Sequence, residues 1–275
     1  MPESPRLRWE GKGLHSGNAC SVEVRATALP GIRFVFGDGS AFRVEEASCQ
    51  GDGRGSTLSF PNGITIRTVE HLLSALGGMG FWNAEILVEG GEVPALDGSA
   101  LPFASGISSF LERHEVAQPQ AFHLETPVSA RDPKNGRAIV ILPAEAFGVS
   151  CVIDYPGTWI GTQAFHVGGL DPGTYLKEIA GAKTFCLESE VEALRAAGLG
   201  KGGTLDNTLV VGEKGPLNPQ ALTVPDSCAR HKVLDLIGDL SLLGCPVVGH
   251  VLAYRSGHGL HLSLVSRLKR IIPRT

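Results

Sequence analysis

The stretch 229-ARHKVLDLIGDLSLLG-244 decides the fold, because its apolar residues recur at the spacing of one helix face. At about 100° per residue, a helix over 227–243 gathers these apolar residues on one side: Val233, Leu236, Ile237, Leu240 and Leu243. Asp226 is placed to cap the N-terminus, and Gly244 followed by Pro246 supplies a stop signal. The stretch therefore predicts an amphipathic helix packed against a core.

The opposite side of this predicted helix carries His231, Asp235, Gly238 and Asp239. One interpretation is a solvated face with pairs four residues apart. The other is a functional face, because a His and an Asp one turn apart present two metal-ligating atoms in one direction. Gly238 would also leave room for a close neighbour. The spacing alone leaves both interpretations open.

The segment 68-TVEHLLSAL-76 predicts a second helix of the same construction, with Glu70 and His71 opposite its Val and Leu residues. If two domains pack face to face, these residues look across a cleft at His231 and Asp235. Two His and one Asp leave one coordination position open, as in a catalytic zinc site. Glu70 beside a ligand is suited to act as a general base, although a solvated carboxylate fits the local pattern equally well.

The segment 254-YRSGHGLHL-262 places His258 at the start of a helix directly after a strand. A histidine there is able to donate a proton to a leaving amine. Because a helix N-terminus disfavours the charged imidazole, a carboxylate such as Asp239 is needed to keep it protonated. His261 is expected to lie at the surface.

The chain shows the same order of predicted elements twice. The first half has a hairpin, a helix, a strand and a helix, at 20–37, 68–76, 83–90 and 101–114. The second half follows the same order at 137–155, 231–243, 246–256 and 258–271. We expect an α+β fold of two similar domains, 1–117 and 118–275, each a sheet covered by helices. The segments 157–165 and 198–211 are expected as extra loops of the second domain, and one continuous α+β domain is the alternative.

Composition narrows the function classes. The 275 residues carry a net charge of −4 and 43% hydrophobic residues, which is typical of a globular protein without a basic face for nucleic acid. No apolar run approaches the roughly 20 residues of a membrane-spanning helix, and no signal peptide is apparent, so a cytoplasmic location is expected. The six cysteines include no C-x-x-C pair, which argues against a disulfide framework or a cysteine zinc site.

Seven motifs occur in one order along nearly the whole chain: GKGLHSG, TVEHLLSAL, EVPALDGSALPF, AKTF, KGGTLDNTLVV, RHKVLDLIGDLSLLG and AYRSGHGL. Together they resemble the UDP-3-O-acyl-N-acetylglucosamine deacetylases, the zinc amidases of the committed step of lipid A synthesis in Gram-negative bacteria. The resemblance implies a two-domain α+β fold, a β-α-α-β sandwich with its metal at the domain junction. It also implies hydrolysis of the N-acetyl group of the UDP-sugar substrate to acetate and a free amine. A monomer is expected.

The resemblance also implies roles for particular residues. His71, His231 and Asp235 would hold zinc, with ferrous iron as the alternative metal. Glu70 would be the general base, and His258, oriented by Asp239, would stabilise the oxyanion and protonate the departing nitrogen. Thr184 would donate a hydrogen bond to the tetrahedral intermediate.

Substrate contacts follow from the same resemblance. Phe185 and Lys232 would contact the sugar nucleotide. Gly203 and Thr204 would lie at the entrance of an apolar passage for the 3-O-acyl chain, which the insertion at 152–165 would complete.

Three residues depart from the family pattern: Leu142 where a basic residue is common, Lys183 where Arg is usual, and Ser227 where an acidic residue is usual. Two alternatives stay open at this point. Two His and one carboxylate also form the site of non-haem iron oxygenases. A degenerate relative would bind sugar nucleotides or acyl chains without cleaving them.

Overall fold

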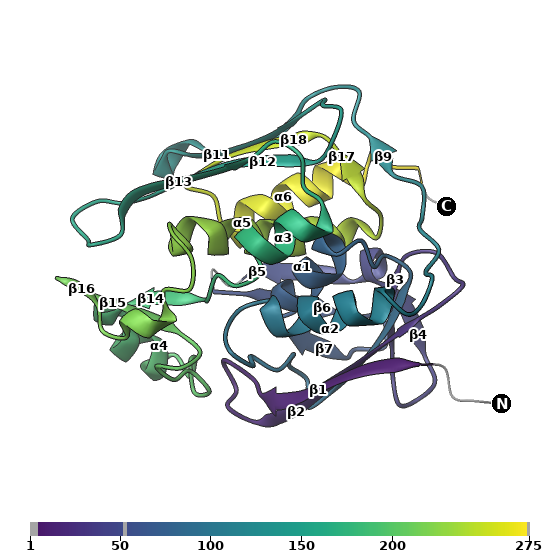
Figure 1. Ribbon diagram of the computed structural model, residues 1–275, viewed down its shortest axis with the longest axis horizontal. Helices are drawn as coiled ribbons and strands as arrows, with labels where there is room; N and C mark the ends of the chain where they lie inside the picture. Colours follow the sequence, from purple (N-terminus) through teal and green to yellow (C-terminus); the bar gives the residue numbers. More distant parts are fainter. Residues whose placement is uncertain (1–4, 52–53, 274–275) are drawn as a thin grey trace.

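In the computed structural model, which describes residues 5–51 and 54–273, two five-stranded sheets form the outer layers and helices lie between them (Figure 1). The first sheet has, in spatial order, β1 (Arg6–Lys12), β2 (Ala19–Ala26), β8 (Ala84–Glu89), β3 (Ile32–Val35) and β4 (Ala41–Arg43). The second has β10 (Val128–Asp132), β11 (Arg137–Leu142), β18 (His250–Tyr254), β12 (Gly148–Tyr155) and β13 (Gly161–Val167).

The two sheets share their strand order and their strand directions. The central strand β8 runs antiparallel to β2 and parallel to β3, and β18 runs antiparallel to β11 and parallel to β12. Both predicted hairpins are therefore wrong, because a later strand inserts between their two members. Alternating hydrophobicity identifies a strand but not its neighbour. The parallel pairs need a crossover, and the chain between their strands passes through a helix in both halves.

Six α-helices occupy the described part of the chain: α1 (Glu70–Gly78), α2 (Leu101–Leu111), α3 (Pro172–Glu178), α4 (Val191–Ala196), α5 (Ser227–Leu240) and α6 (His258–Leu268). The two helices of the predicted functional faces, α1 and α5, pack against each other in the middle layer, and α6 packs on α5 (Figure 1). Gly238 of α5 permits this approach, because a Cβ there would overlap the Glu70 carbonyl group of α1. The mixed α+β class expected from the sequence is thus confirmed.

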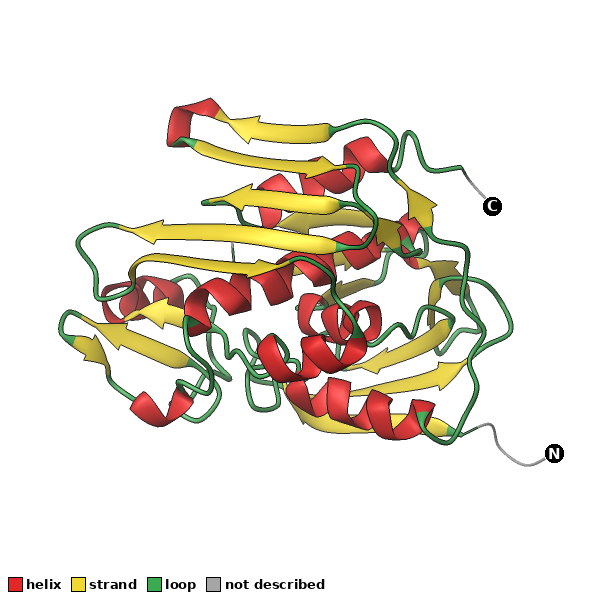
Figure 2. Cartoon of the chain, turned by 45° about the horizontal axis from the view of Figure 1, so that its top comes forward, coloured by secondary structure: helices red, strands yellow, loops and turns green. Residues whose placement is uncertain are grey.

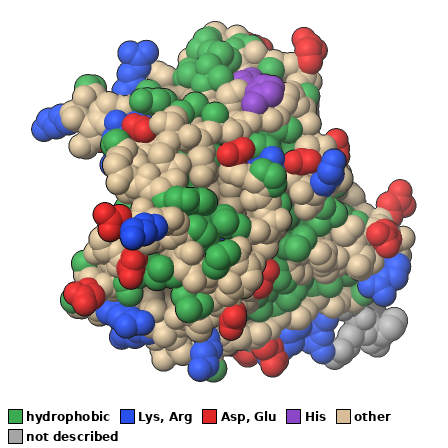
Figure 3. Space-filling view, turned by 60° about the vertical axis from the view of Figure 1, so that its left-hand side comes forward, with side chains coloured by type: hydrophobic (Ala, Val, Ile, Leu, Met, Phe, Trp, Pro, Cys, Tyr) green, Lys and Arg blue, Asp and Glu red, His purple; other side chains and the backbone are tan. Residues whose placement is uncertain are grey.

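The apolar core lies between the helices and the inner faces of both sheets, with the second sheet above its helices in Figure 2. Fully buried residues come from the first sheet, from α1 and α5, and from the second sheet: Val22, Val24, Ile86, Leu72, Leu76, Val233, Leu236, Ile141 and Val251. On the face shown in Figure 3, charged side chains of both signs are spread over the surface. In the residues described, no helix combines the length and apolar character needed to cross a membrane.

Helix α5 begins and ends where the sequence predicts, but its N-terminus is built differently. It runs over Ser227–Leu240 and continues as a 3-10 turn to Leu243, and Gly244 closes it with a φ of 73°. Asp226 is left-handed, with a φ of 47°, and its side chain makes no capping hydrogen bond, so the predicted cap is wrong. Gln163 of β13 instead accepts a hydrogen bond from the Ala229 N–H at 3.2 Å.

Small additional sheets extend both halves. The first half adds β5 (Ser48–Gly51), β6 (Ser56–Ser59) and β7 (Thr65–Arg67), and the second adds β14 (Phe185–Leu187), β15 (Leu209–Gly212) and β16 (Gly215–Pro216). The second of these sheets forms a lobe with α4 at the left of Figure 1. A further pair joins β9 (Phe122–His123) to β17 (Val247–Val248).

One insertion was not anticipated from the sequence, and one expected loop is wrong. The first half has an insertion of its own, which the sequence analysis missed because strands such as SCQG and STLS lack a clear apolar alternation. The segment 157–165 is not an extra loop, because most of it forms β13, the edge strand of the second sheet.

Candidate active site

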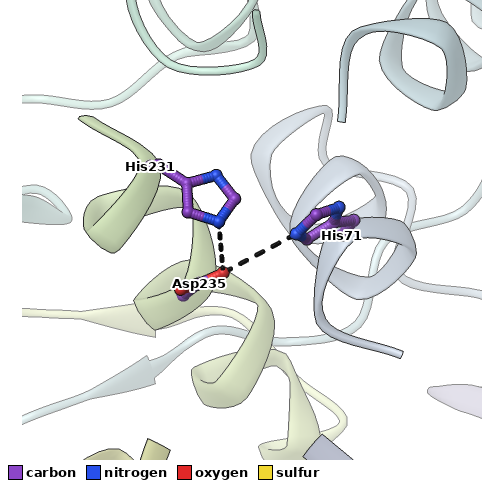
Figure 4. A group of neighbouring side chains, drawn as sticks. All are labelled: His71, His231 and Asp235. Atoms are coloured by element: carbon purple, nitrogen blue, oxygen red, sulfur yellow. Dashed lines mark ion pairs between the residues drawn. The ribbon is translucent and has the colours of Figure 1, made fainter. Parts of the chain in front are cut away.

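Helices α1 and α5 bring together three metal-ligating side chains. His71 comes from α1, and His231 and Asp235 lie one turn apart on α5. The Asp235 Oδ1 atom lies 3.8 Å from His71 Nε2 and 3.4 Å from His231 Nε2 (Figure 4). All three side chains are buried. The interpretation of these helix faces as solvated is therefore wrong.

The donor set fits a divalent transition metal. Neighbouring ligand atoms around a tetrahedral zinc with bonds near 2.0 Å lie about 3.3 Å apart, which is close to the separations found here. His231 Nδ1 lies 3.0 Å from the Ala182 carbonyl oxygen and must donate its proton there, which leaves the Nε2 lone pair free for a metal. The three metal-ligating atoms thus lie close together without a hydrogen bond between any two of them.

The electrostatics of these groups match the states that metal ligands require. Burial lowers the pKa of His71 to about 3 and also lowers the pKa of His231, so both imidazoles are neutral. Burial alone would raise the pKa of Asp235, but the positive charge of Lys232, whose Nζ lies 2.8 Å from Asp235 Oδ2, outweighs it and holds that pKa well below its usual value. Neutral imidazoles and an ionised carboxylate are the forms that bind metal.

Glu70 begins α1, directly before His71, and is 3% exposed. Its Oε2 atom accepts a hydrogen bond from the Ser56 N–H at 3.0 Å. Burial raises the pKa of the Glu70 carboxyl to about 7. A carboxylate with a pKa near neutrality, beside a metal-binding set, has the property that a general base needs.

His258 begins α6 and lies beside the metal-ligating group. Its Nδ1 atom bonds Asp239 Oδ2 at 2.7 Å, and its Nε2 atom lies 3.8 Å from Asp235 Oδ2. Burial alone would lower the pKa of His258, but the Asp239 carboxylate outweighs it and raises the pKa to about 10. His258 is therefore a protonated imidazole with its outer nitrogen directed toward the site.

The expectation that His261 lies at the surface is wrong. It is 1% exposed, and its Nδ1 atom bonds the same Asp239 oxygen at 2.8 Å. Its position three residues after His258 places both rings on one side of α6. That spacing was the signal available in the sequence.

One pocket joins most of the predicted site residues. Its lining includes eight of them: Glu70, His71, Thr184, Phe185, His231, Lys232, Asp235 and His258. Asp239 lies behind His258, to which it is hydrogen-bonded. Gly203 and Thr204 do not line this pocket as far as the described residues define it, and lie in the loop between α4 and β15.

The same pocket contains residues that the sequence analysis did not single out. Arg54 reaches Glu190 with two hydrogen bonds, at 2.8 and 3.3 Å, so the pair links the two insertions across the pocket. Tyr155, at the end of β12, meets the Phe185 ring edge to face at 5.8 Å. Lys232 Nζ lies 5.4 Å from the Phe185 ring centre. Arg54, Tyr155 and Glu190 come from separate elements, so no local spacing in the sequence relates them to the site.

The structure accounts for one of the three departures from the family pattern. Lys183 Nζ donates hydrogen bonds to the carbonyl oxygens of Asp97 at 2.8 Å and Asp206 at 2.7 Å, a task that a single ammonium group performs. Leu142 ends β11 opposite His250 and is not among the residues that line the pocket. Ser227 begins α5 with a buried hydroxyl, and nothing in the structure explains the choice of serine.

Replacing Lys183 by methionine is expected to lower both stability and turnover. The change leaves two carbonyl groups without their charged donor, at a cost of about 2–3 kcal/mol. It also loosens the backbone at Thr184, whose N–H donates to the Gly98 carbonyl at 2.7 Å. Thermal unfolding and kcat measure the two effects, with Lys177→Met at an exposed lysine as the control. Wild-type stability and kcat in Lys183→Met would contradict this role.

A buried carboxylate supports the segment that leads into α1. Glu92 is 1% exposed and accepts hydrogen bonds from the His15 N–H at 2.8 Å, the Ser16 N–H at 2.9 Å and the Thr68 hydroxyl at 2.9 Å. Thr68 has a φ of 56°, a left-handed conformation, two residues before Glu70. Glu92 thus ties the loop at 13–18 to the start of the helix that carries Glu70 and His71.

Replacing Glu92 by glutamine is expected to lower the free energy of unfolding by about 2–3 kcal/mol at neutral pH, because an amide NH₂ then faces a buried donor. Burial alone would raise the pKa of Glu92, but hydrogen bonds from His15 and Ser16 outweigh it and lower that pKa. A carboxyl with a lowered folded-state pKa stabilises the protein above its unfolded-state pKa, and this contribution is lost as pH falls. Denaturant unfolding should show the difference between the two proteins shrinking in acid; a difference that is constant with pH would contradict the assignment.

Two imidazoles and a carboxylate at ligand distance, with a buried Glu and a buried His in the same pocket, form the arrangement expected of a metal-dependent hydrolase. The chain belongs to the family described as LpxC: UDP-3-O-acyl N-acetylglycosamine deacetylase, whose model matches residues 4–270.

Individual relatives are similar over nearly the whole chain. A UDP-3-O-acyl-N-acetylglucosamine deacetylase of Solibacter usitatus (strain Ellin6076) is 40% identical, covering 94% of this chain and 87% of the relative. A relative of the same name in Anaeromyxobacter sp. (strain Fw109-5) is 39% identical, covering 96% of this chain and 86% of the relative. A relative of the same name in Phenylobacterium zucineum (strain HLK1) is 40% identical, covering 97% of this chain and 91% of the relative.

Proposed function

We propose that the chain hydrolyses the N-acetyl group of UDP-3-O-(3-hydroxyacyl)-N-acetylglucosamine, with zinc held by His71, His231 and Asp235. The chain is a deacetylase of lipid A biosynthesis by its family, and the products would be acetate and the free amine. The convergence of these three side chains beside the buried Glu70 is the observation that carries the assignment of roles. The oxygenase alternative is not supported, because the chain belongs to a deacetylase family. The non-catalytic alternative is not supported, because the proposed ligands, base and acid are all present in one pocket.

Zinc bound by these residues would supply Lewis-acid chemistry toward the scissile carbonyl and toward water. The chain contributes two neutral imidazoles and one carboxylate to it, with the His231 ring oriented by the Ala182 carbonyl. Ferrous iron accepts the same donors, so metal analysis of the purified protein distinguishes the two metals.

Glu70 is proposed as the general base. Its carboxylate lies in the same pocket as the metal-ligating atoms, and burial brings its pKa to about 7. At neutral pH a substantial fraction is therefore ionised and able to take a proton from water. The Ser56 N–H, bonded to Oε2, fixes the orientation of the carboxylate.

His258 is proposed as the general acid. Asp239 keeps its ring protonated and directs Nε2 toward the pocket, where the proton can pass to the departing glucosamine nitrogen. The same positive charge stabilises the oxyanion that develops on the substrate. Thr184, which also lines the pocket, is proposed to donate a hydrogen bond to that oxyanion.

Substrate contacts are proposed for two further residues of the pocket. Lys232 is held protonated, because Asp235 outweighs the effect of burial and raises its pKa, so it offers a cation to a diphosphate. Phe185 supplies an aromatic wall beside it. Gly203 and Thr204, in the loop between α4 and β15, stay proposed at the entrance of an acyl-chain passage.

A division into two similar domains, 1–117 and 118–275, is part of the proposal. The identical strand order and strand directions of the two large sheets support it. The monomeric state and cytoplasmic location expected from the sequence remain predictions.

Release of free amine from UDP-3-O-(3-hydroxyacyl)-N-acetylglucosamine by the purified protein tests this function. UDP-N-acetylglucosamine without the acyl chain is the matched control substrate. We expect turnover of the acylated substrate and far slower turnover of the control. Equal rates would contradict the proposed acyl recognition, and no turnover of either would contradict the proposed reaction.

A further inference from the structure

The Asp239 carboxylate is shared by two imidazoles. Its Oδ2 atom bonds His258 Nδ1 at 2.7 Å and His261 Nδ1 at 2.8 Å. Its Oδ1 atom accepts a hydrogen bond from the Ser56 hydroxyl at 2.6 Å. Asp239 is completely buried, so these donors from α6 and β6 replace the water that would otherwise solvate it.

The hydrogen bonds fix the tautomer of His261. A carboxylate oxygen only accepts, so His261 Nδ1 carries the proton in its bond to Asp239. His261 Nε2 lies 2.9 Å from the Ser256 hydroxyl. Burial lowers the pKa of His261, so the ring is neutral and Nε2 accepts the Ser256 proton. His261 is therefore a neutral imidazole with a hydrogen bond at each ring nitrogen, and it donates to Asp239 through Nδ1.

These contacts form a hydrogen-bond network rather than a second metal centre. Asp239, His258 and His261 offer ligand-type atoms close together. The nitrogen-to-oxygen separations of 2.7 and 2.8 Å are those of charge-assisted hydrogen bonds. They are shorter than the roughly 3.3 Å expected between neighbouring ligands of a tetrahedral zinc.

The second imidazole has a clear mechanical consequence. The terminal torsion of an aspartate is broad, so one hydrogen bond to His258 does not determine the plane of the carboxylate. His261 on one oxygen and Ser56 on the other determine it. The oxygen that accepts from His258 is thereby held in place, and the His258 ring is held with Nε2 toward Asp235 and the pocket.

We propose that His261 is a positioning residue, whose Nδ1–H fixes the Asp239 carboxylate so that His258 is aligned for proton transfer to the leaving nitrogen. The inference rests on the proposed function for the role of His258. Its structural part, the alignment of His258 through Asp239, stands independently of the substrate.

Two variants at position 261 distinguish the effect of the hydrogen-bond donor from the effect of side-chain volume. In His261→Asn, the side-chain amide nitrogen lies close to the place of Nδ1 and keeps a donor for Asp239. In His261→Leu, the volume is similar but the donor is lost. We expect His261→Leu to lower kcat by about 10–100-fold, the usual effect of losing a partner that orients an active-site group, with KM and metal content unchanged. We expect His261→Asn to recover most of that loss.

A double-mutant cycle tests whether the effect passes through His258. In a His258→Ala background, His261→Leu should cause no further loss of kcat, because the group that it aligns is already absent. The same fold loss in both backgrounds would overturn the proposal. Wild-type kcat in His261→Leu would also overturn it.

Proton NMR of the imidazole N–H groups gives a readout without turnover. A His258 Nδ1–H bonded to a carboxylate resonates far downfield; we expect this signal to stay in place in His261→Asn and to shift or broaden in His261→Leu. An unchanged signal in His261→Leu would overturn the positioning role. A wild-type protein with this NMR pattern and no deacetylation would contradict the proposed function and leave the alignment supported.

Discussion

Replacing Glu70 by glutamine is expected to lower kcat by about 10²–10⁴-fold, the usual contribution of a general base. Glutamine keeps the size of the side chain and an oxygen for the Ser56 N–H, but it cannot take a proton. The neighbouring His71, His231 and Asp235 are unchanged, so metal content should stay at its wild-type value. Loss of turnover with full metal content is the expected combination.

Steady-state deacetylation and metal analysis on the same samples measure this effect. Glu112→Gln, at an exposed carboxylate after α2, is the matched control and should behave as the wild type. A Glu70→Gln protein with wild-type kcat would show that another group accepts the proton. Loss of metal together with activity would show that Glu70 acts on the metal site and not as a base.

Replacing His231 by alanine is expected to abolish zinc binding at stoichiometric concentration, and activity with it. His231 provides one of three donors, and its ring is fixed in advance by the Ala182 carbonyl. Loss of a partner outside the ligand shell costs roughly 10–100-fold in affinity, and loss of a ligand should cost more.

Competition with a fluorescent chelator measures the zinc affinity of this variant. His166→Ala, at an exposed histidine of β13, removes an imidazole without touching the site and should keep wild-type affinity. Thermal unfolding checks that the His231→Ala protein is folded. Wild-type zinc affinity in His231→Ala would place the metal elsewhere.

The helices of the site could be predicted from the sequence because their signals are local. Apolar residues at helical spacing predicted α1, α5 and α6, and steps of four residues put His231, Asp235 and Asp239 on one face. The burial of that face could not be predicted from spacing alone. It depends on how α1 and α5 pack, and Gly238 was the local sign that something approaches closely.

The rest depended on contacts between distant parts of the chain. Strand β8 lies between β2 and β3, and β18 lies between β11 and β12, although each comes later in the chain than both of its neighbours. Both predicted hairpins were therefore wrong. Ser56 reaches Asp239 across 183 positions and Arg54 reaches Glu190 across 136, and no periodicity relates such residues. His261 differs, because its spacing from His258 was visible and only its burial was missed.

Zinc titration of the metal-free protein, with deacetylation of the acylated UDP-sugar followed at each addition, measures whether one zinc ion per chain supports the reaction. We expect no activity after chelation, and a linear recovery that ends at one zinc ion per chain. Activity that survives complete chelation, or a recovery that needs a second equivalent of zinc, would contradict a single metal held by His71, His231 and Asp235.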